Sequence, residues 1–451
     1  VIPNFIEGIA QKQPVYKNLL ARFPNNPDSI EYYLNRPHKV KLFDYEKGTI
    51  EKEMSTMDSI RYMVHFMHCA FVAMEPQTGA VKAWVGDIDF KSWKYDKVTA
   101  MRQPGSTFKL FVYTEAMNQG LTPCDKRRDE YFSMQVFDKT QNKEVTWAPT
   151  NANGYFTGDS IPLKAAFARS INSVAVRLGQ EMGINRIAET AHKMGIESPL
   201  DETPALALGS SDINLLELAN AYSTIANDGK YVKRQLVTRI LDRNGKEVYK
   251  SSISEEQVIP YKSAFLMQQL LMGGTHEPGG TSMSLNGYVG NFHDTDWGGK
   301  TGTSNNHSDA WFMGVSPNLV VGAWVGGEYR CIHFRTGALG QGSRTALPIC
   351  GYFLEAVLKD PAFSKYRVKF GKPKDADITS SMYNCSSYAP RAKADTLRRD
   401  SISIEEEIIL DEDGNPVERQ HPTKSPSNEE KSEPAATHKK AKEEAVNFDN
   451  L

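Results

Sequence analysis

The sequence has few cysteines, and no part of it reads as a metal site or a disulfide framework. Its five cysteines are Cys69, Cys124, Cys331, Cys350 and Cys385, and no two of them form a Cys-x-x-Cys pair. This scatter argues against a zinc site. An odd count leaves a single bridge open without requiring one, so the sequence does not indicate the redox compartment.

Long apolar runs and an N-terminal targeting pattern are missing as well. No stretch of about eighteen apolar residues is present, so we expect no segment of this chain to span a bilayer. The chain starts at Val1, and no signal-peptide pattern follows. We therefore expect the chain to be part of a longer product, in which any membrane anchor or targeting signal lies upstream.

Charge of one sign is not in excess. The 53 Lys and Arg residues nearly balance the 55 Asp and Glu residues, which gives a net charge of −2. This balance gives no reason to expect nucleic acid or an anionic membrane surface as a bulk partner. Hydrophobic residues make up 40% and charged residues 24% of the 451 residues, which is typical of a globular protein with two or three domains.

Strand-like patterns lie at both ends of a mostly helical region. Residues 71–74 and 80–85 flank a turn that contains Pro and Gly, which predicts a hairpin. Residues 310–315 and 319–325 predict two more strands, joined by Ser-Pro-Asn. Because most segments between these strands have a helical pattern, the arrangement favours one antiparallel sheet packed on helices over repeated βαβ units.

The composition divides the chain into four parts. Residues 1–45 are polar with several Pro and Asn, and we interpret them as a connection from a missing upstream region, with little core of its own. Residues 46–365 hold the predicted strands and most helices, and residues 366–395 form a C-terminal extension. In residues 396–451 charged runs alternate with Ser and Pro and large apolar residues become rare, which predicts a disordered tail.

A helix start carries the first candidate site. Residues 102–109 read Arg-Gln-Pro-Gly-Ser-Thr-Phe-Lys, and an apolar helical pattern begins after the Pro-Gly break and ends near Gly120. Ser106 and Lys109 are three residues apart, so their side chains share one helix face. A lysine desolvated against an apolar helix could lose its proton and activate the serine hydroxyl. Alone, this pattern is more often a helix cap followed by a solvated lysine.

Two further polar clusters follow. Ser170 and Asn172 lie in a break between two predicted helices, where the hydroxyl could relay a proton and the amide could hold a substrate carbonyl; a helix cap is the alternative. Residues 300–303 read Lys-Thr-Gly-Thr and enter a predicted strand. Gly302 leaves room for another extended backbone, and Lys300 adds a fixed positive charge. This set suits a substrate that ends in a carboxylate, and a turn with a surface lysine is the alternative.

The three clusters occur in the order Ser-x-x-Lys, Ser-x-Asn and Lys-Thr-Gly. This order defines the penicilloyl-serine enzymes, which include the penicillin-binding proteins. Four other segments also resemble the transpeptidase domain of class A (bifunctional) penicillin-binding proteins of the type found in Bacteroidetes: residues 102–105, 147–151, 205–209 and 309–312. The resemblance runs from about residue 54 to residue 363 and identifies residues 46–365 as the transpeptidase domain. It implies an α/β (α+β) fold of the penicilloyl-serine transpeptidase or β-lactamase type, with a five-stranded antiparallel sheet packed against helices.

The resemblance also implies a role for each motif residue. Ser106 would be the nucleophile and Lys109 the general base in acylation. Ser170 would pass a proton to the leaving amine, and Lys300 would support that relay electrostatically. The backbone N–H groups of Ser106 and Thr303 would form the oxyanion hole. The substrate-binding residues would be Asn172, Thr301, Gly302 and Thr303.

The implied reaction is acyl transfer on peptidoglycan stem peptides that end in D-Ala-D-Ala, giving 4→3-type cross-links. No metal and no organic cofactor would be needed, and β-lactams would acylate the same serine as covalent inhibitors. Class A members also carry an upstream glycosyltransferase and a membrane anchor. We therefore expect the intact protein at the periplasmic face of the bacterial inner membrane, working with the cell-wall synthesis machinery.

Three other functions stay open at this point. A β-lactamase needs a positioned carboxylate for deacylation, and Leu-Ala-Leu-Gly at residues 206–209 replaces the family's Glu-x-x-x-Asn loop, which argues against this function. A D,D-carboxypeptidase would use water as the acceptor where a transpeptidase uses an amine. A penicillin-sensing or scaffolding domain would be acylated without cross-linking anything.

Overall fold

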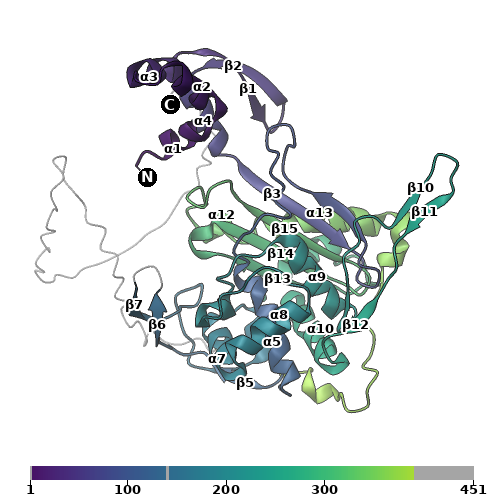
Figure 1. The fold of residues 1–451 in the computed structure, drawn as a ribbon. Coiled ribbons are helices and arrows are strands. Elements are labelled where there is room, and N and C mark those ends of the chain that lie inside the picture. Colours follow the sequence, from purple (N-terminus) through teal and green to yellow (C-terminus); the bar gives the residue numbers. More distant parts are fainter. Residues whose placement is uncertain (1–2, 139–141, 391–451) are drawn as a thin grey trace, which may run out of the picture. The chain divides into compact units, whose positions relative to one another are not determined.

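The computed structural model describes residues 3–138 and 142–390 (Figure 1). The predicted tail, residues 396–451, lies outside the described residues, as does the end of the C-terminal extension. Within the described part of the chain, no helix combines the length and the apolar character that crossing a membrane requires.

A five-stranded antiparallel sheet lies at the centre, in the strand order β13-β14-β15-β3-β4. Its strands are β3 (Met67–Met74), β4 (Val81–Val85), β13 (Gly298–Thr303), β14 (Asp309–Val315) and β15 (Val320–Gly327). This sheet confirms the predicted fold class, and the β3–β4 and β14–β15 pairs are the two predicted hairpins. Strand β13, which carries the Lys-Thr-Gly motif, is an edge strand of the sheet.

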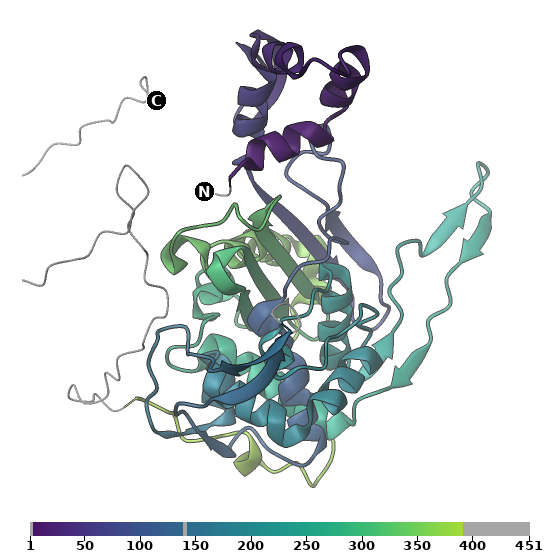
Figure 2. The same cartoon turned by 60° about the vertical axis from the view of Figure 1, so that its left-hand side comes forward.

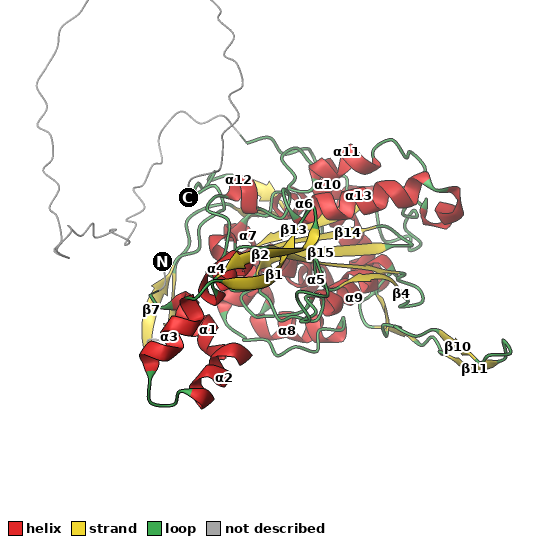
Figure 3. Cartoon of the chain, turned by 90° about the horizontal axis from the view of Figure 1, so that it is seen from above, coloured by secondary structure: helices red, strands yellow, loops and turns green. Residues whose placement is uncertain are grey.

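Helices cover both faces of the sheet (Figure 3). Because successive side chains of a strand point to opposite faces, Val72 and Met74 pack into one hydrophobic core, and Phe71 and Ala73 pack into another. The first core is built with α5 (Lys109–Asn118), α6 (Leu163–Ala168), α7 (Asn172–Met182), α8 (Ile184–Lys193), α9 (Leu215–Ala226) and α10 (Tyr261–His276). The second core is built with α11 (Asn286–Val289) and α13 (Ala346–Lys359).

The N-terminal block has more core than the sequence suggests. It consists of α1 (Phe5–Lys12), α2 (Pro14–Arg22), α3 (Pro27–Asn35), β1 (His38–Asp44), β2 (Gly48–Met54) and α4 (Thr56–Val64). Ile9, Leu34 and Ile60 belong to a separate buried cluster of this block. The single helices look polar because each of them buries only a few side chains, and these come together only after α1, α3 and α4 have packed.

Short paired strands and turns complete the described chain. A turn at residues 242–245 joins β10 (Arg239–Leu241) to β11 (Glu247–Lys250), and Figure 2 shows this hairpin extending away from the central sheet. The other pairs are β5 (Lys126–Arg128) with β8 (Ser160–Pro162), β6 (Met134–Asp138) with β7 (Lys143–Trp147), and β9 (Lys230–Val232) with β12 (Glu255–Gln257). Six of the short helices are η2 (Pro204–Leu208), η3 (Met283–Leu285), η4 (Asn305–His307), α12 (Gly337–Gly340), η5 (Pro361–Tyr366) and η6 (Ser380–Met382).

A disulfide ties the C-terminal extension to the helical side of the domain. Cys124 and Cys385 are bonded although 261 positions separate them in the sequence. Nearby, the Lys164 amine donates a hydrogen bond to the Tyr383 carbonyl at 3.2 Å. The sequence could not assign this pair, because scattered cysteines give no information on which of them meet in space.

Removing this disulfide should destabilise the domain. We expect the double replacement Cys124→Ser, Cys385→Ser to lower the free energy of unfolding by about 2–5 kcal/mol, since the bridge closes a long loop and restricts the unfolded chain. Denaturant unfolding with and without reductant measures this effect. Cys331→Ser, at an unpaired thiol, serves as the control. Its free energy of unfolding should differ between oxidising and reducing conditions by as much as that of the wild type. Equal stability of the wild type in both conditions would show that the bridge contributes nothing.

Candidate active site

Ser106 lies in a short 3-10 turn, η1 (Gly105–Phe108), that leads directly into α5. The predicted helix start is therefore in place, but the helix is not amphipathic. Every residue from Lys109 to Met117 is buried, so the helix is surrounded by protein on all sides. This burial places the Lys109 side chain away from water, as the proposed role of a neutral amine requires.

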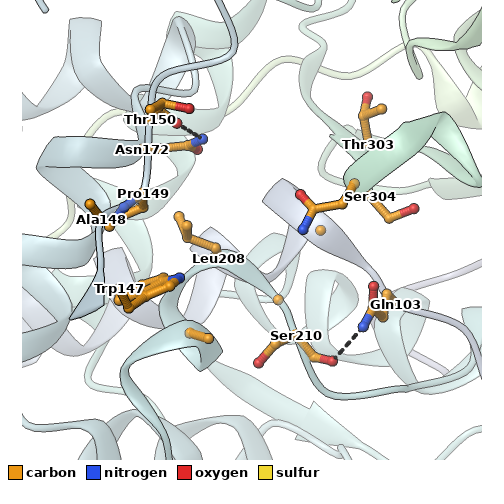
Figure 4. A pocket seen from close by; sticks show the side chains of 14 residues that line it. Gln103, Trp147, Ala148, Pro149, Thr150, Asn172, Leu208, Ser210, Thr303 and Ser304 are labelled. Atoms are coloured by element: carbon orange, nitrogen blue, oxygen red, sulfur yellow. Dashed lines mark hydrogen bonds between the residues drawn. The ribbon is translucent and has the colours of Figure 1, made fainter. Parts of the chain in front are cut away.

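The turn that carries Ser106 is anchored on two sides. The Arg102 guanidinium donates to the carbonyls of Gly327 and Glu328 at 3.1 and 3.0 Å, at the end of β15. The Gln103 side chain donates to the Ser210 carbonyl at 3.0 Å (Figure 4). These bonds fix the chain just before Ser106, so the hydroxyl is held by backbone that cannot shift without breaking several contacts.

Two glycines allow the turn to lie against the edge strand β13. Gly105 has a φ of 53°, and a Cβ on it would lie 2.6 Å from the Thr303 carbonyl oxygen. A Cβ on Gly302 would lie 2.4 Å from the Pro104 carbonyl oxygen. Gly302 is thus needed for packing within the chain itself, whereas the sequence suggested that it makes room for an added backbone. The close approach puts the Thr303 backbone beside the residue that precedes Ser106.

The Lys109 amine is fully buried and points at the Ser-x-Asn motif. Its Nζ donates to the Ser170 carbonyl at 2.8 Å and to Asn172 Oδ1 at 2.7 Å, and lies 3.3 Å from Ser170 Oγ. Burial, and then the charge of nearby Lys300, hold the pKa of Lys109 well below its usual value. A neutral amine can form the two short bonds with its two N–H groups and keeps a lone pair that can accept a proton.

Lys300 approaches the same hydroxyl from β13. Its Nζ donates to Ser170 Oγ at 2.8 Å and to the Thr301 carbonyl at 2.9 Å. Burial lowers the pKa of Lys300 to about 7. The sequence suggested a fixed positive charge at this position, but at neutral pH the charge of a lysine with this pKa is only partial.

Ser170 is held between the two amines in an unusual backbone conformation. It lies in the predicted break between α6 and α7, with a φ of 59°. A left-handed conformation is uncommon for a residue other than glycine, and such strain is often found at functional sites. The Ser170 amide donates to the Phe167 carbonyl at 3.0 Å, which stabilises the turn.

Asn172 is oriented by a network that the sequence did not reveal. Its Nδ2 donates to the Thr150 carbonyl at 2.8 Å (Figure 4), while its Oδ1 accepts from Lys109. Asn151 Oδ1 accepts the Asn172 backbone N–H at 2.9 Å, and Asn151 Nδ2 donates to Asp129 at 2.7 Å. Residues 147–151 stood out in the sequence only as a family-like segment, because nothing local links position 151 to position 172.

Five of the motif residues line two neighbouring hollows, and Asn172 and Thr303 line both of them. One, of about 310 Å³, is shown in Figure 4, with Asn172 on one side and Thr303 on the other. The second, of about 290 Å³, is lined by Ser106, Ser170 and Thr301 among others. Within residues 3–138 and 142–390, no Asp or Glu lines either hollow.

The threonines of β13 contribute differently. Thr301 is buried, and its hydroxyl donates to Thr281 Oγ1 at 2.7 Å. Thr303 is partly exposed, and its Oγ1 accepts the Gly342 N–H at 3.3 Å. Both line the hollow that contains Ser106, so the structure brings all eight predicted site residues together, with Gly302 as a packing position between the two threonines.

Comparison with known proteins agrees with this arrangement. Residues 69–324, more than half of the chain, match the family model described as the penicillin binding protein transpeptidase domain. The chain belongs to this family. Residues 1–67 match the model described as the penicillin-binding protein middle domain. The penicillin-binding transpeptidases are acyl transferases of the serine type, and the three ordered motifs of such enzymes meet here at one cleft.

Individual relatives are similar to parts of the chain. Penicillin-binding protein 2D of Bacillus subtilis (strain 168) is 33% identical over 264 residues, which cover 57% of this chain and 36% of that protein. Penicillin-binding protein 1A of Rickettsia conorii is 29% identical over 390 residues, 81% of this chain and 46% of that protein. The structure of penicillin-binding protein 1A from Haemophilus influenzae matches with a TM-score of 0.59 and 26% identity, over 65% of this chain and 48% of that one. The chain thus spans less than half the length of these relatives.

Proposed function

We propose that this chain is the transpeptidase part of a class A penicillin-binding protein of the type found in Bacteroidetes. It cross-links peptidoglycan stem peptides through an acyl-serine intermediate, and β-lactams inhibit it by acylating the same serine. One observation carries this proposal. Two buried amines, Lys109 and Lys300, converge on the Ser170 hydroxyl in the hollow that contains Ser106.

In the first step, Ser106 Oγ attacks the carbonyl carbon of the penultimate D-Ala, and the neutral Lys109 amine takes the hydroxyl proton. The C–N bond to the terminal D-Ala then breaks. The leaving nitrogen receives a proton through Ser170, whose hydroxyl contacts both amines. The products are free D-Ala and an ester between the shortened peptide and Ser106.

In the second step, an amine of a neighbouring stem peptide attacks the ester. Its proton passes back through Ser170 and Lys109 to Ser106 Oγ, which leaves as the hydroxyl, so the enzyme is regenerated and one amide bond has formed. The backbone N–H groups of Ser106 and Thr303 stabilise the oxyanion in both steps, each contributing about 10²–10³ in rate. The close packing of Gly105 against Thr303 supports this pairing.

The substrate-binding roles follow from the lining of the two hollows. The second N–H of Asn172 Nδ2 can hold a substrate carbonyl, since the first is given to Thr150. Thr301 and Thr303 bind the terminal carboxylate in the hollow that contains Ser106, and Gly302 keeps the strand close to Ser106.

The wider context is part of the same proposal. Residues 46–365 contain the transpeptidase domain, residues 1–45 belong to the N-terminal block that connects it to an upstream region, and residues 366–395 are an extension. The intact protein also carries a glycosyltransferase domain and a membrane anchor, faces the periplasm, and works with the cell-wall synthesis machinery. Similarity to penicillin-binding proteins 1A supports the class, and the Cys124–Cys385 disulfide supports an oxidising compartment.

Catalysis of β-lactam hydrolysis is not favoured by this cleft. An acyl-enzyme persists when no carboxylate activates water for its hydrolysis. In the part of the chain that the structure describes, neither hollow beside Ser106 is lined by Asp or Glu. Leu208, from the segment that replaces the β-lactamase loop, lines one hollow with an apolar side chain (Figure 4).

The reaction can be tested with a synthetic stem pentapeptide that ends in D-Ala-D-Ala, incubated with and without a D-amino acid as acceptor. We expect mass spectrometry to detect the exchange product, because the acyl-enzyme favours an amine over water. Release of D-Ala with only the shortened acid as product would instead indicate a D,D-carboxypeptidase. Penicillin binding without any turnover of the peptide would indicate a sensing or scaffolding domain.

The acylation rate should have a bell-shaped pH dependence. It should rise with pH as Lys109 loses its proton, at a pH well below the usual pKa of lysine. It should fall above about pH 7, where Lys300 in the free enzyme loses the charge that supports Ser170. Second-order acylation rates measured from about pH 5 to about pH 10 report these two groups. Lys300→Arg should remove the alkaline limb; an unchanged alkaline limb would assign it to another group.

A further inference from the structure

A positively charged side chain that the motifs do not include lies at the Ser106 hollow. Arg169 comes directly before Ser170, at the end of α6, and lines the hollow together with Ser106, Thr301 and Thr303. Among the described side chains that line this hollow, only His307 could also carry a positive charge, and an arginine keeps its charge at every working pH.

Apart from Arg169, no described residue that lines this hollow carries a permanent positive charge for a substrate carboxylate. Lys300 is the motif residue expected to supply it, but burial lowers its pKa to about 7. Its Nζ is also directed at Ser170 Oγ and at its neighbour's carbonyl, Thr301 O. A carboxylate bound only by threonine hydroxyls would lose much of its hydration without gaining an opposite charge.

The C-terminal extension holds the Arg169 guanidinium in place. The guanidinium lies over the Tyr388 ring, with Cζ 5.0 Å from the ring centroid, and Nη2 donates to the Tyr388 carbonyl at 3.2 Å. The Tyr388 hydroxyl donates to Asp159 at 2.9 Å, and the disulfide at Cys385 anchors the same segment. Gly279 packs on the guanidinium, since a Cβ there would lie 3.2 Å from Cζ.

This arrangement leaves hydrogen-bonding capacity unused. Arg169 Nε is buried and has no hydrogen-bond partner among the described residues. Two acids on segments that pack near Arg169 already have other partners. Asp159 accepts a hydrogen bond from the Tyr388 hydroxyl, and Glu277 lies 3.7 Å from the Lys164 amine. A stacked, preordered guanidinium that keeps an unpaired N–H suits the recognition of a carboxylate.

We propose that Arg169, positioned by Tyr388, binds the carboxylate of the donor's terminal D-Ala and the corresponding carboxylate of β-lactams, next to Thr301 and Thr303. This inference rests on the proposed function and adds a binding residue from outside the three motifs. It also gives the C-terminal extension a role, because Tyr388 fixes the guanidinium beside the hollow.

The test compares the acylation of two enzymes by two ligands. Second-order acylation rates are measured for benzylpenicillin and for its methyl ester, which lacks the charge, with the wild type and Arg169→Gln. The wild type should prefer the free acid, and the variant should lose about 10–100-fold on the acid, as expected for a hydrogen bond to a charged group, but less than about threefold on the ester. Equal losses on both compounds, or no loss on either, would overturn the inference.

A matched control separates binding from loosening of the extension. Lys262→Met removes the hydrogen bond to Asp377 of the extension, and Lys262 does not line the hollow. It should leave the preference for the acid unchanged; a loss of preference as large as that of Arg169→Gln would mean that loosening alone accounts for the effect.

If Arg169→Gln does not fold, Arg169→Lys takes its place, because it keeps the charge and loses the bidentate geometry. Its preference for the acid must fall below that of the wild type, and an equal preference would overturn the inference. Failure of the wild type to react with either compound would count against the proposed function itself. A reactive wild type with an equally selective Arg169→Gln would count against this inference alone.

Discussion

Ser106→Ala should abolish covalent labelling by a fluorescent penicillin, with a loss in acylation rate of about 10⁴-fold or more. The hydroxyl at this position is the only proposed nucleophile, and an alanine leaves nothing to form the ester. The turn around it is anchored through Arg102 and Gln103, whose contacts the substitution leaves in place. The measurement is the labelling rate, with the unfolding temperature as a check on the fold.

The main alternative to this prediction is that a second serine in the cleft, Ser170, is the nucleophile. The amines of Lys109 and Lys300 contact the Ser170 hydroxyl, so geometry alone would also allow Ser170 to act as the nucleophile. Ser170→Ala should slow acylation but leave a detectable adduct. Ser59→Ala, in a helix outside the cleft, is the control for loss of a hydroxyl and should label like the wild type. Residual labelling of Ser106→Ala at a wild-type rate would refute the assignment.

Lys109→Met should have the next largest effect, slowing acylation by about 10²–10⁴-fold, the usual contribution of a general base. Methionine resembles the lysine side chain in length and is apolar, so it suits a site that is buried on all sides. Rates of penicillin labelling, measured beside the unfolding free energy of the same variant, separate a chemical effect from a folding effect.

The lowered pKa of Lys109 also affects the free energy of unfolding, and the direction of this effect follows from proton binding. Because the pKa of Lys109 is lowered in the folded state, the unfolded chain binds the proton more tightly, and stability rises with pH between the folded-state pKa and the usual 10.5. At neutral pH the lysine therefore carries a cost that methionine removes. We therefore expect Lys109→Met to acylate slowly, while its free energy of unfolding falls by less than the loss of the lysine's hydrogen bonds alone would predict.

Lys109→Arg distinguishes a base from a mere cation. Arginine keeps its charge and cannot accept a proton at working pH, so it should be as inactive as methionine. A variant with arginine that acylates near the wild-type rate would show that position 109 needs only positive charge, and the proposed proton transfer would be wrong.

Much of the fold could be predicted from local patterns. The β3–β4 and β14–β15 hairpins, the helix that begins beside Ser106 and the break at Ser170 all appear in the structure, because turn residues and apolar runs encode them within a few positions. Their assembly into one antiparallel sheet followed from strands at both ends of a helical region.

The features that the sequence did not predict depend on contacts between distant positions. The disulfide joins residues 124 and 385, and the amide of Asn151 orients Asn172 through bonds that no local pattern announces. The charge of Lys300 was overestimated because its burial arises only when β13 packs against α10 and the Ser106 turn. No local pattern marks Arg169, because its contact with Tyr388 forms only when the extension packs beside it.

The most direct test of the account is the position at which penicillin attaches. Wild-type chain labelled with benzylpenicillin, digested and analysed by tandem mass spectrometry, should carry the penicilloyl group on Ser106 and on no other residue. An adduct on Ser170, or on any residue outside the turn at residues 105–108, would contradict the claim that the Ser106 hydroxyl is the nucleophile.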